Sequence, residues 1–380
     1  MPISWRTDFP GGNGLLLDVD ETFPRPVLRF AAEPKNCPQA LWFHFRVFAA
    51  GRHGLRVVLT NPEQTLGGWN WSDNCLVWRG GQSSWRRTGA PERIDTPGGR
   101  VEWAWQIDAR GDVVEVAHCF PYQLEDLAAT LVTLDGAHNS TMIGVTLGGR
   151  PLMRTFNCLP SSERPGVFLA ARHHAGETPG SWVLDGLLRH VAGARRLRDQ
   201  ITWWAVPFVN LDDVLAGSYG KNPWPHDCNR AYGPPAPRRP EIGAVMADAG
   251  RLKTGSARMF FADIHAPGHA ERANYVPLRG WDEDSPVNPI GEEFANAFRR
   301  ACPEDIRSPK AHITPAPSAS LCGGMSSRSW AQEVLGVEAV SLEISYQGNG
   351  SKYYTIKDYH RLGVALAETI AEWFRRPAET

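Results

Sequence analysis

The chain has 380 residues, 42% of them hydrophobic and 21% charged, with a formal net charge of −1. This length suits one large domain or two ordinary ones, and this composition is typical of a globular chain with a full hydrophobic core. The charge balance does not indicate a nucleic-acid partner, and no apolar run approaches the roughly 18 residues of a membrane span. We therefore expect neither a nucleic-acid nor a membrane partner.

The N-terminus and the cysteines favour a cytoplasmic protein. Residues 1–6 lack the basic segment and the following apolar stretch of a signal peptide. The seven cysteines are scattered and show no Cys-x-x-Cys spacing. Such a pattern is typical of reduced thiols. We do not expect a zinc site built from cysteines, whereas a site built from histidines remains open.

Residues 1–117 are predicted to form a β-domain. Short apolar and aromatic runs at 41–47 and 55–59 are separated by turn residues. Residues 101–107 alternate between apolar and polar side chains, as a half-buried strand does, and 113–117 return after a turn. Several short strands at this spacing predict an antiparallel β-sandwich.

The pattern changes at residue 118. A helix is predicted at 123–131, and the runs 142–147 and 152–156 flank a Gly-Gly-Arg-Pro turn that predicts a hairpin. Strands are then predicted at 167–171, 202–209, 259–264 and 339–344, and helices at 181–191, 291–300 and 358–374. We expect residues 118–380 to form a second, α/β domain, with a mixed sheet covered by helices on both faces.

The loop after the apolar strand 167–171 carries a candidate metal site. His174 and Glu177 stand three residues apart there, and Gly176 would help the chain turn between them. Open α/β sheets place their functional sites at such strand ends. A catalytic zinc takes three protein ligands and leaves one position open. His265, which ends another apolar run, can supply the third ligand.

Two further motifs contain polar residues that can take part in substrate binding or catalysis. In Asp-Cys-Asn-Arg at 227–230, the guanidinium of Arg230 can bind a carboxylate and Asn229 can add a donor, although an Asn-Arg pair seen alone is more often an ordinary surface arginine. Glu343 is a single acid within an apolar strand. Since a buried carboxylate is costly, Glu343 either has a structural partner or performs acid–base chemistry beside a metal.

These motifs, in this order, resemble the zinc carboxypeptidase superfamily and most closely its cytosolic carboxypeptidase branch. In that branch an N-terminal β-sandwich precedes the peptidase domain. The segment Arg-His-His-Ala-Gly-Glu-Thr at 172–178 is similar to the His-Pro-Gly-Glu-Thr loop of the branch. The resemblance implies one Zn²⁺ per chain, bound by His174, Glu177 and His265. His173 is then a neighbour of the site, because only His174 has the three-residue spacing to Glu177.

The same resemblance extends to the substrate side of the site. The segment 227–230 is similar to the Asp-Leu-Asn-Arg motif of the branch. This similarity implies that Asn229 and Arg230 bind the C-terminal carboxylate of a substrate. Glu343 falls where the family has its general base, so the resemblance implies that role for Glu343.

The chain departs from the branch at one important position. The branch usually has Gly-Asn-Tyr-Arg, whose arginine polarises the scissile carbonyl, whereas this chain has Gly-Ser-Tyr-Gly ending at Gly220 and followed by Lys221. Lys221 can take that place, but its point charge does not copy a bidentate fork. Loss of one such donor costs about 100-fold in rate.

A second departure concerns the substrate side chain. Arg328 lies near the position where the branch has a basic residue for an acidic side chain, but the lysine that usually accompanies it corresponds to Gly323. The resemblance therefore only suggests a preference for C-terminal glutamate.

The predicted function is that of a cytoplasmic zinc metallocarboxypeptidase that releases C-terminal residues from peptides or proteins. Its partner would be a peptide or protein C-terminus, and a homo-oligomer is compatible with the sequence. One alternative keeps the zinc but acts as an amidohydrolase or deacylase on acyl-amino acids or γ-linked peptides. Another is a weakened peptidase that serves as a binding module.

Overall fold

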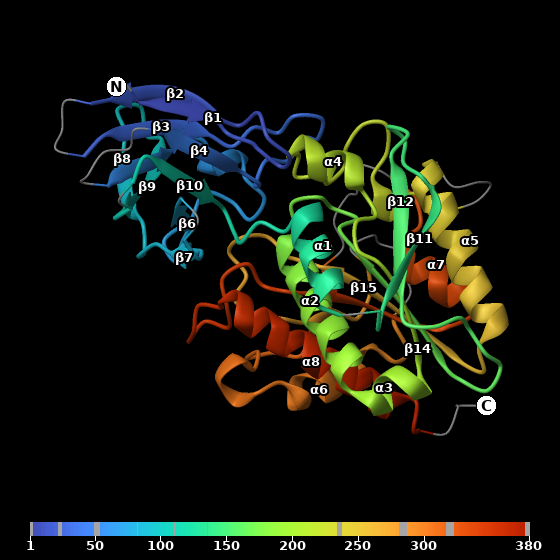
Figure 1. Cartoon of the computed structure of the whole chain (residues 1–380). Helices are drawn as coiled ribbons and strands as arrows, with labels where there is room; N and C mark the ends of the chain where they lie inside the picture. Colours follow the sequence, from blue (N-terminus) through green and yellow to red (C-terminus); the bar gives the residue numbers. More distant parts are fainter. Residues whose placement is uncertain are drawn as a thin grey trace.

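The computed structural model describes residues 3–21, 25–48, 54–81, 83–109, 111–134, 136–233, 238–280, 287–316 and 323–376. Figure 1 shows a smaller part made of strands, coloured blue to cyan, beside a larger part in which helices surround a sheet, coloured green to red. This arrangement confirms the predicted fold class, in which a β-rich region precedes a mixed α/β sheet.

The N-terminal part consists of two five-stranded sheets. One has the strand order β1-β4-β10-β6-β7, and the other has the order β2-β3-β5-β9-β8. The bounds of these strands are β1 Ser4–Arg6, β2 Leu15–Asp20, β3 Val27–Ala31, β4 His44–Phe48, β5 Leu55–Leu59, β6 Val77–Gly80, β7 Arg86–Arg87, β8 Glu92–Asp95, β9 Val101–Ile107 and β10 Val113–Ala117.

Aromatic side chains join these two sheets into a sandwich. Trp5 on β1 stacks on Phe45 of β4 with ring centroids 3.7 Å apart, and Phe30 on β3 of the other sheet lies 5.0 Å from Phe45. The prediction of a wholly antiparallel sandwich is wrong at one pair, because β3 and β5 run parallel. The intervening β4 belongs to the other sheet, so the chain crosses between the sheets and returns in its original direction.

The α/β part is built on one six-stranded sheet with the order β11-β12-β14-β13-β15-β18. The hairpin β11–β12 and the pair β12–β14 are antiparallel, whereas β14, β13, β15 and β18 are mutually parallel neighbours. Its strands are β11 Asn139–Val145, β12 Pro151–Phe156, β13 Gly166–Ala171, β14 Thr202–Val206, β15 Met259–His265 and β18 Glu338–Glu343, and a small separate pair is formed by β16 Val276–Pro277 and β17 His312–Ile313.

Helices cover both faces of this sheet (Figure 1). Val167 and Leu169 of β13 belong to the core that includes α2, α6 and α8, whereas Phe168 belongs to the core that includes α5 and α7. The central strands are therefore apolar on both sides, as strands of a covered parallel sheet are. The helices are α1 Leu124–Thr133, α2 Thr178–Gly193, α3 Arg195–Gln200, α4 Leu211–Ala216, α5 Pro240–Gly255, α6 Gly291–Ala301, α7 Ser327–Glu333 and α8 Ile356–Trp373.

The N-terminal sheets pack directly on segments next to the candidate site. Arg87 on β7 donates hydrogen bonds to the backbone carbonyls of Tyr346 and Tyr354, both at 2.8 Å. Gln347 exchanges two hydrogen bonds of 3.1 Å with the backbone of Cys75. Asn13 donates to the carbonyl of Gly217 at 2.7 Å. The N-terminal sheets therefore hold the chain that follows β18 and the loop that leads to Lys221.

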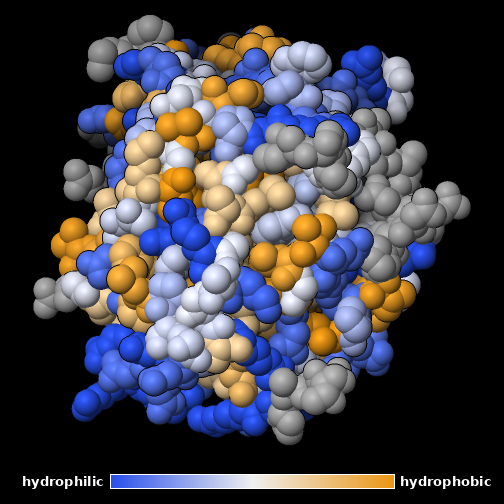
Figure 2. All heavy atoms as spheres, turned by 90° about the vertical axis from the view of Figure 1, so that its right-hand side faces the viewer, coloured by the Kyte–Doolittle hydropathy of each residue, from blue (hydrophilic) through white to orange (hydrophobic). Residues whose placement is uncertain are grey.

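The surface in Figure 2 shows small groups of hydrophobic side chains separated by hydrophilic ones. Within the described ranges, no helix combines the length and the apolar character that crossing a membrane requires.

Candidate metal centre

The loop between β13 and α2 is held in place by a buried arginine. Arg172 directly follows β13 and adopts the left-handed conformation, with φ of 63°. Its guanidinium donates to the carbonyls of Ala175 at 2.7 Å and of Tyr122 at 3.0 Å. A non-glycine residue rarely adopts such a φ unless its surroundings hold it there. These hydrogen bonds therefore fix the short segment that presents His173, His174 and Glu177.

Gly176 in this loop serves a purpose other than the predicted one. Its φ is not in the left-handed region, but a Cβ at this position would lie 2.5 Å from the ring of Tyr219. The glycine is thus needed because the loop passes close to Tyr219, whose own carbonyl accepts the Gly176 N–H at 2.9 Å.

The three predicted metal ligands meet at the ends of two neighbouring parallel strands. His174 and Glu177 follow β13, and His265 ends β15. The Nδ1 atom of His174 lies 2.8 Å from one carboxylate oxygen of Glu177, and Nδ1 of His265 lies 2.8 Å from the other. All three side chains are buried, and their ligand atoms lie within 4.8 Å of one another. Two imidazole nitrogens and a carboxylate are a donor set that suits a catalytic divalent metal.

The outer nitrogen of each imidazole also has a carboxylate beside it. His174 Nε2 lies 3.4 Å from Asp227, and His265 Nε2 lies 2.6 Å from Asp263. Burial disfavours a charged imidazole, but the neighbouring carboxylates outweigh burial and raise the pKa of both histidines. The same imidazoles lower the pKa of Glu177, in spite of its burial. Carboxylates on the far side of ligating imidazoles are a regular feature of protein metal sites.

Glu343 lies at the end of β18, directly opposite His265 in the strand pairing. Its side chain is buried, and one carboxylate oxygen has no hydrogen-bond partner among the described residues. Burial, assisted by the nearby charge of Glu177, raises the pKa of Glu343 to about 7. Such a carboxyl group suits proton transfer near neutral pH.

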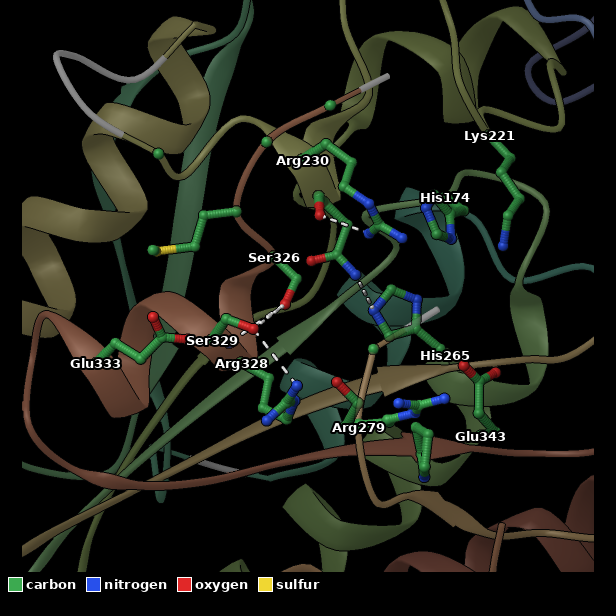
Figure 3. A pocket seen from close by; sticks show the side chains of 18 of the residues that line it. His174, Lys221, Arg230, His265, Arg279, Ser326, Arg328, Ser329, Glu333 and Glu343 are labelled. Carbon is green, nitrogen blue, oxygen red and sulfur yellow. Dashed lines mark hydrogen bonds between the residues drawn. The ribbon is translucent and has the colours of Figure 1, made fainter. Parts of the chain in front are cut away.

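A cavity of about 490 Å³ opens onto these side chains. Figure 3 shows Lys221, Arg230 and Glu343 around the imidazoles of His174 and His265. The described lining residues include five cationic side chains and two carboxylates: Lys221, Arg230, Arg238, Arg279 and Arg328, with Glu333 and Glu343. The cavity is therefore rich in positive charge and suits an anionic ligand.

Every predicted substrate-binding residue lines this cavity. Asn229 and Arg230 lie in a short 3-10 turn whose start is capped by Asp227. Asn229 places its amide nitrogen 3.0 Å from His265. Arg328 lies on α7 beside Ser329 (Figure 3), is 2% exposed, and hydrogen-bonds to Gln332.

Position 220, where the related branch usually has an arginine, has a left-handed backbone conformation in this chain. Gly220 has φ of 76°, and a Cβ there would lie 2.6 Å from the backbone nitrogen of Ala175. An arginine cannot occupy position 220 without a change in this loop. The adjacent Lys221 lines the cavity instead, and its charge acts on both His174 and Glu343.

Several residues of the site were not singled out from the sequence. Asp263 precedes His265 by two residues on β15, and this period-2 spacing, which places both side chains on one face, could have indicated it. Tyr232, whose hydroxyl lies 2.7 Å from His173, and Arg279, which lines the cavity, offered no comparable signal, because each reaches the site through the tertiary fold.

Comparisons with known proteins find relatives in sequence and in fold. No family model matches the sequence. The sequence is 28% identical over 205 residues to cytosolic carboxypeptidase 3 of Mus musculus, which covers 49% of this chain. The chain spans about a fifth of the length of that relative, since the match covers 20% of it.

Two solved structures share nearly the whole fold. A metallo-carboxypeptidase from Burkholderia cenocepacia superimposes with a TM-score of 0.79 at 21% identity, covering 99% of each chain. A metallo-carboxypeptidase from Pseudomonas aeruginosa, in complex with (2-guanidinoethylmercapto)succinic acid, gives a TM-score of 0.78 at 20% identity and covers 98% of this chain and 99% of that one.

The fold is that of these metallo-carboxypeptidase structures, and it brings together the buried His-x-x-Glu…His cluster. In sequence the chain is similar to parts of the cytosolic carboxypeptidases, and in fold it is similar to bacterial metallo-carboxypeptidases.

Proposed function

We propose that this protein is a zinc-dependent metallocarboxypeptidase that releases C-terminal amino acids from peptides or proteins. The observation that carries the proposal is the convergence of His174 Nδ1 and His265 Nδ1 on the two oxygens of Glu177, at one end of a cationic cavity. These three residues would hold one Zn²⁺ per chain. When bound, Zn²⁺ supplies a Lewis acid for hydrolysis of the peptide carbonyl.

Glu343 is proposed as the general base. Its raised pKa supports this role, as does its carboxylate oxygen that has no hydrogen-bond partner among the described residues. Glu343 takes a proton from the water that attacks the carbonyl carbon. As the C–N bond breaks, Glu343 gives that proton to the leaving amine nitrogen, so the carboxylate is regenerated after each turnover.

The cations of the cavity are proposed to position the substrate. Asn229 and Arg230 bind the free C-terminal carboxylate, because they lie together beside His265. Lys221 supplies the positive charge that the carbonyl oxygen needs as negative charge develops on it. Its place in the lining of the same cavity supports this assignment.

We further propose an acidic C-terminal residue, such as glutamate, as the preferred leaving group. The surplus of cations in the lining supports this preference, and Arg328 is the residue assigned to the acidic side chain.

The proposal is tested by incubating the zinc-loaded protein with peptides that differ only in the last residue, and by measuring the released amino acid by chromatography. Peptides ending in glutamate should be cleaved with a kcat/KM about tenfold higher than those ending in lysine, which corresponds to about 1.4 kcal/mol. Peptides with an amidated C-terminus are the matched control and should resist cleavage. Equal cleavage of the amidated peptides would reject carboxylate binding and favour a zinc amidohydrolase or deacylase.

A weakened peptidase that acts as a binding module is a second candidate. The backbone of Gly220, which leaves no room for the usual arginine, favours it. This candidate is supported if the zinc-loaded protein binds peptides ending in glutamate but releases no amino acid from them.

We also propose a cytoplasmic location. The six described cysteines are all free, which suits a reducing compartment.

A further inference from the structure

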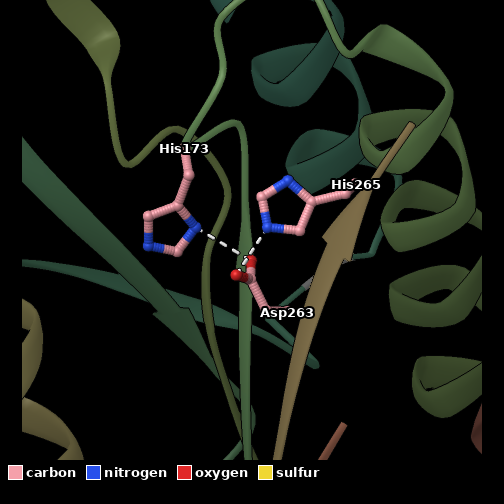
Figure 4. A group of neighbouring side chains, drawn as sticks. All are labelled: His173, Asp263 and His265. Atoms are coloured by element: carbon pink, nitrogen blue, oxygen red, sulfur yellow. Dashed lines mark hydrogen bonds and ion pairs between the residues drawn. The ribbon is translucent and has the colours of Figure 1, made fainter. Parts of the chain in front are cut away.

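A chain of hydrogen bonds runs from His265 into the protein core on the side away from Glu177. His265 Nε2 lies 2.6 Å from one oxygen of Asp263, and His173 Nδ1 lies 2.8 Å from the other (Figure 4). The outer nitrogen of His173 lies 2.7 Å from the hydroxyl oxygen of Tyr232. All four side chains are at most 2% exposed.

The chemistry of these groups sets the direction of each hydrogen bond. An ionised Asp263 only accepts, so both imidazole nitrogens that face it must carry hydrogens. A neutral His173 that donates through Nδ1 accepts through Nε2, and the Tyr232 hydroxyl can donate there. The hydroxyl of Ser327 donates to Asp263 as well. Each of these buried groups is thus satisfied in a single arrangement.

This arrangement also decides the tautomer of His265. A hydrogen on Nε2 leaves Nδ1 with its lone pair facing Glu177 and His174, as a metal ligand requires. The other tautomer would let Nε2 accept from the Asn229 amide, 3.0 Å away, but it would take the imidazole N–H away from Asp263. The orientation of the Asp263 carboxylate therefore keeps His265 in the tautomer that can bind a metal through Nδ1.

We propose that His173 is a positioning residue for the metal centre, because it holds the Asp263 carboxylate in the orientation that orders His265. This inference rests on the proposed function, since it assumes that His265 takes up Zn²⁺. His173 is adjacent in sequence to the proposed ligand His174, but its side chain faces Asp263 on β15. The loop after β13 therefore supplies two proposed ligands and also orients the third, His265.

A second metal ion is the rival explanation of this cluster. His173, Asp263 and His265 also place their ligand atoms within 4.8 Å of one another. However, the hydroxyls of Tyr232 and Ser327 complete the hydrogen bonding of these groups without an ion. A metal between them would have to displace both imidazole hydrogens and leave Tyr232 without its acceptor.

Two substitutions of His173 test the proposal. His173→Leu keeps a side chain of similar bulk but removes the donor to Asp263. His173→Asn keeps a donor, because its amide nitrogen is as many bonds from Cα as Nδ1 is. Zinc affinity is measured by competition with a chelator, and the absorption spectrum of the Co²⁺-loaded protein reports the geometry around the ion.

We expect His173→Leu to weaken zinc binding about tenfold and to alter the Co²⁺ spectrum, since loss of such outer partners costs about 10–100-fold in affinity. His173→Asn should keep most of the wild-type affinity and spectrum. His138→Leu is the matched control, because His138 is also buried and neither of its ring nitrogens has a hydrogen-bond partner among the described residues. It should leave both measurements unchanged.

A double substitution tests whether His173 acts through Asp263. In an Asp263→Asn background, His173→Leu should weaken zinc binding by much less than tenfold. An equal further loss would overturn the proposal, as would wild-type affinity in His173→Leu. Two metal ions per wild-type chain, of which His173→Leu loses one, would identify a second metal site instead. A wild-type chain that binds no zinc would overturn the proposed function and this inference together.

Discussion

Glu343 is the residue on which the proposed chemistry depends most directly. We expect Glu343→Gln to lower kcat by about 10²–10⁴-fold, because glutamine keeps the shape of the side chain but cannot accept the proton of the attacking water. Release of the C-terminal amino acid measures the loss, and elemental analysis should show an unchanged zinc content. Activity within a few-fold of the wild type would remove Glu343 from the mechanism.

Lys221 makes a second prediction at the scale of single residues. Lys221→Ala should lower kcat by about 100-fold with a smaller effect on KM, because the lost charge acts mainly on the transition state. Peptide hydrolysis under saturating and limiting substrate separates the two constants. Gly220→Arg in the Lys221→Ala background should not restore activity, since position 220 has φ of 76° and its Cβ would meet Ala175. Restored activity would show that this loop can relax.

Local pattern in the sequence indicated the candidate ligands His174 and His265 and the acid Glu343, because each lies in or directly after an apolar run. The candidate substrate-binding residues of the cavity were predicted from the resemblance to a known family. The residues that hold these side chains in place are harder to predict. His173 and Tyr232 lie 59 residues apart, and they meet only because the sheet brings their elements together. The hydrogen bonds of Arg172 to nearby carbonyls likewise depend on a φ of 63°, which no local pattern indicates.

At the scale of elements, one ion-pair cluster links three strands of the N-terminal sandwich. Glu115 on β10 stands opposite Arg46 on β4 and Arg79 on β6. Burial alone would raise the pKa of Glu115, but His44, Arg46 and Arg79 together lower it to about 2. The carboxylate is therefore more stable in the folded chain than in the unfolded one.

This cluster should make stability depend on pH in acid. Because the pKa is lowered on folding, the contribution of Glu115 is complete above its unfolded pKa of about 4.5 and disappears as pH falls towards about 2. Glu115→Gln should reduce the free energy of unfolding at pH 7 and flatten its acid dependence, as measured by urea denaturation at several pH values. Asp112→Asn, which changes an exposed acid of the preceding turn, is the control and should leave the curve unchanged.

The parallel core strands were predictable, because a run that is buried on both faces is apolar throughout. Strand β14 ends at Val206, three residues before the predicted end, where Pro207 offers no N–H to a sheet. The parallel pair β3–β5 was not predictable from local pattern, since strand direction depends on the path of the chain between the two sheets. Helix α7 is too short to give a clear periodic signal.

At the scale of the whole molecule, the N-terminal sheets and the α/β part share one hydrophobic core. The division of the chain into domains at residues 1–117 and 118–380 therefore remains a proposal. Strand β10 ends at Ala117, which agrees with that boundary, but contacts such as those of Arg87 cross it. The periodicity of a sequence indicates where strands give way to alternating strands and helices. It does not indicate how tightly the β-rich and the α/β parts pack against each other.

Arg87 offers a test of this packing. Arg87→Ala should lower the free energy of unfolding by about 2–3 kcal/mol, because two carbonyls in the contact between the parts lose a charged donor. Urea denaturation followed by tryptophan fluorescence measures the loss. Its exposed neighbour Arg86 is the matched control, and Arg86→Ala should change stability by no more than about 0.5 kcal/mol. Equal effects of the two substitutions would show that the crossing hydrogen bonds contribute little.

The hydrogen bonds by which Arg172 holds the loop after β13 affect how the protein binds and releases the proposed metal ion. A loop that is already locked by a guanidinium and by neighbouring carbonyls does not have to be organised by a cation. A chelator should then remove the ion without unfolding the protein. Rebinding of the ion should be rapid and reversible. Amide hydrogen exchange in the loop should stay slow after stripping, in contrast to small zinc-folded domains, which lose their structure with their metal.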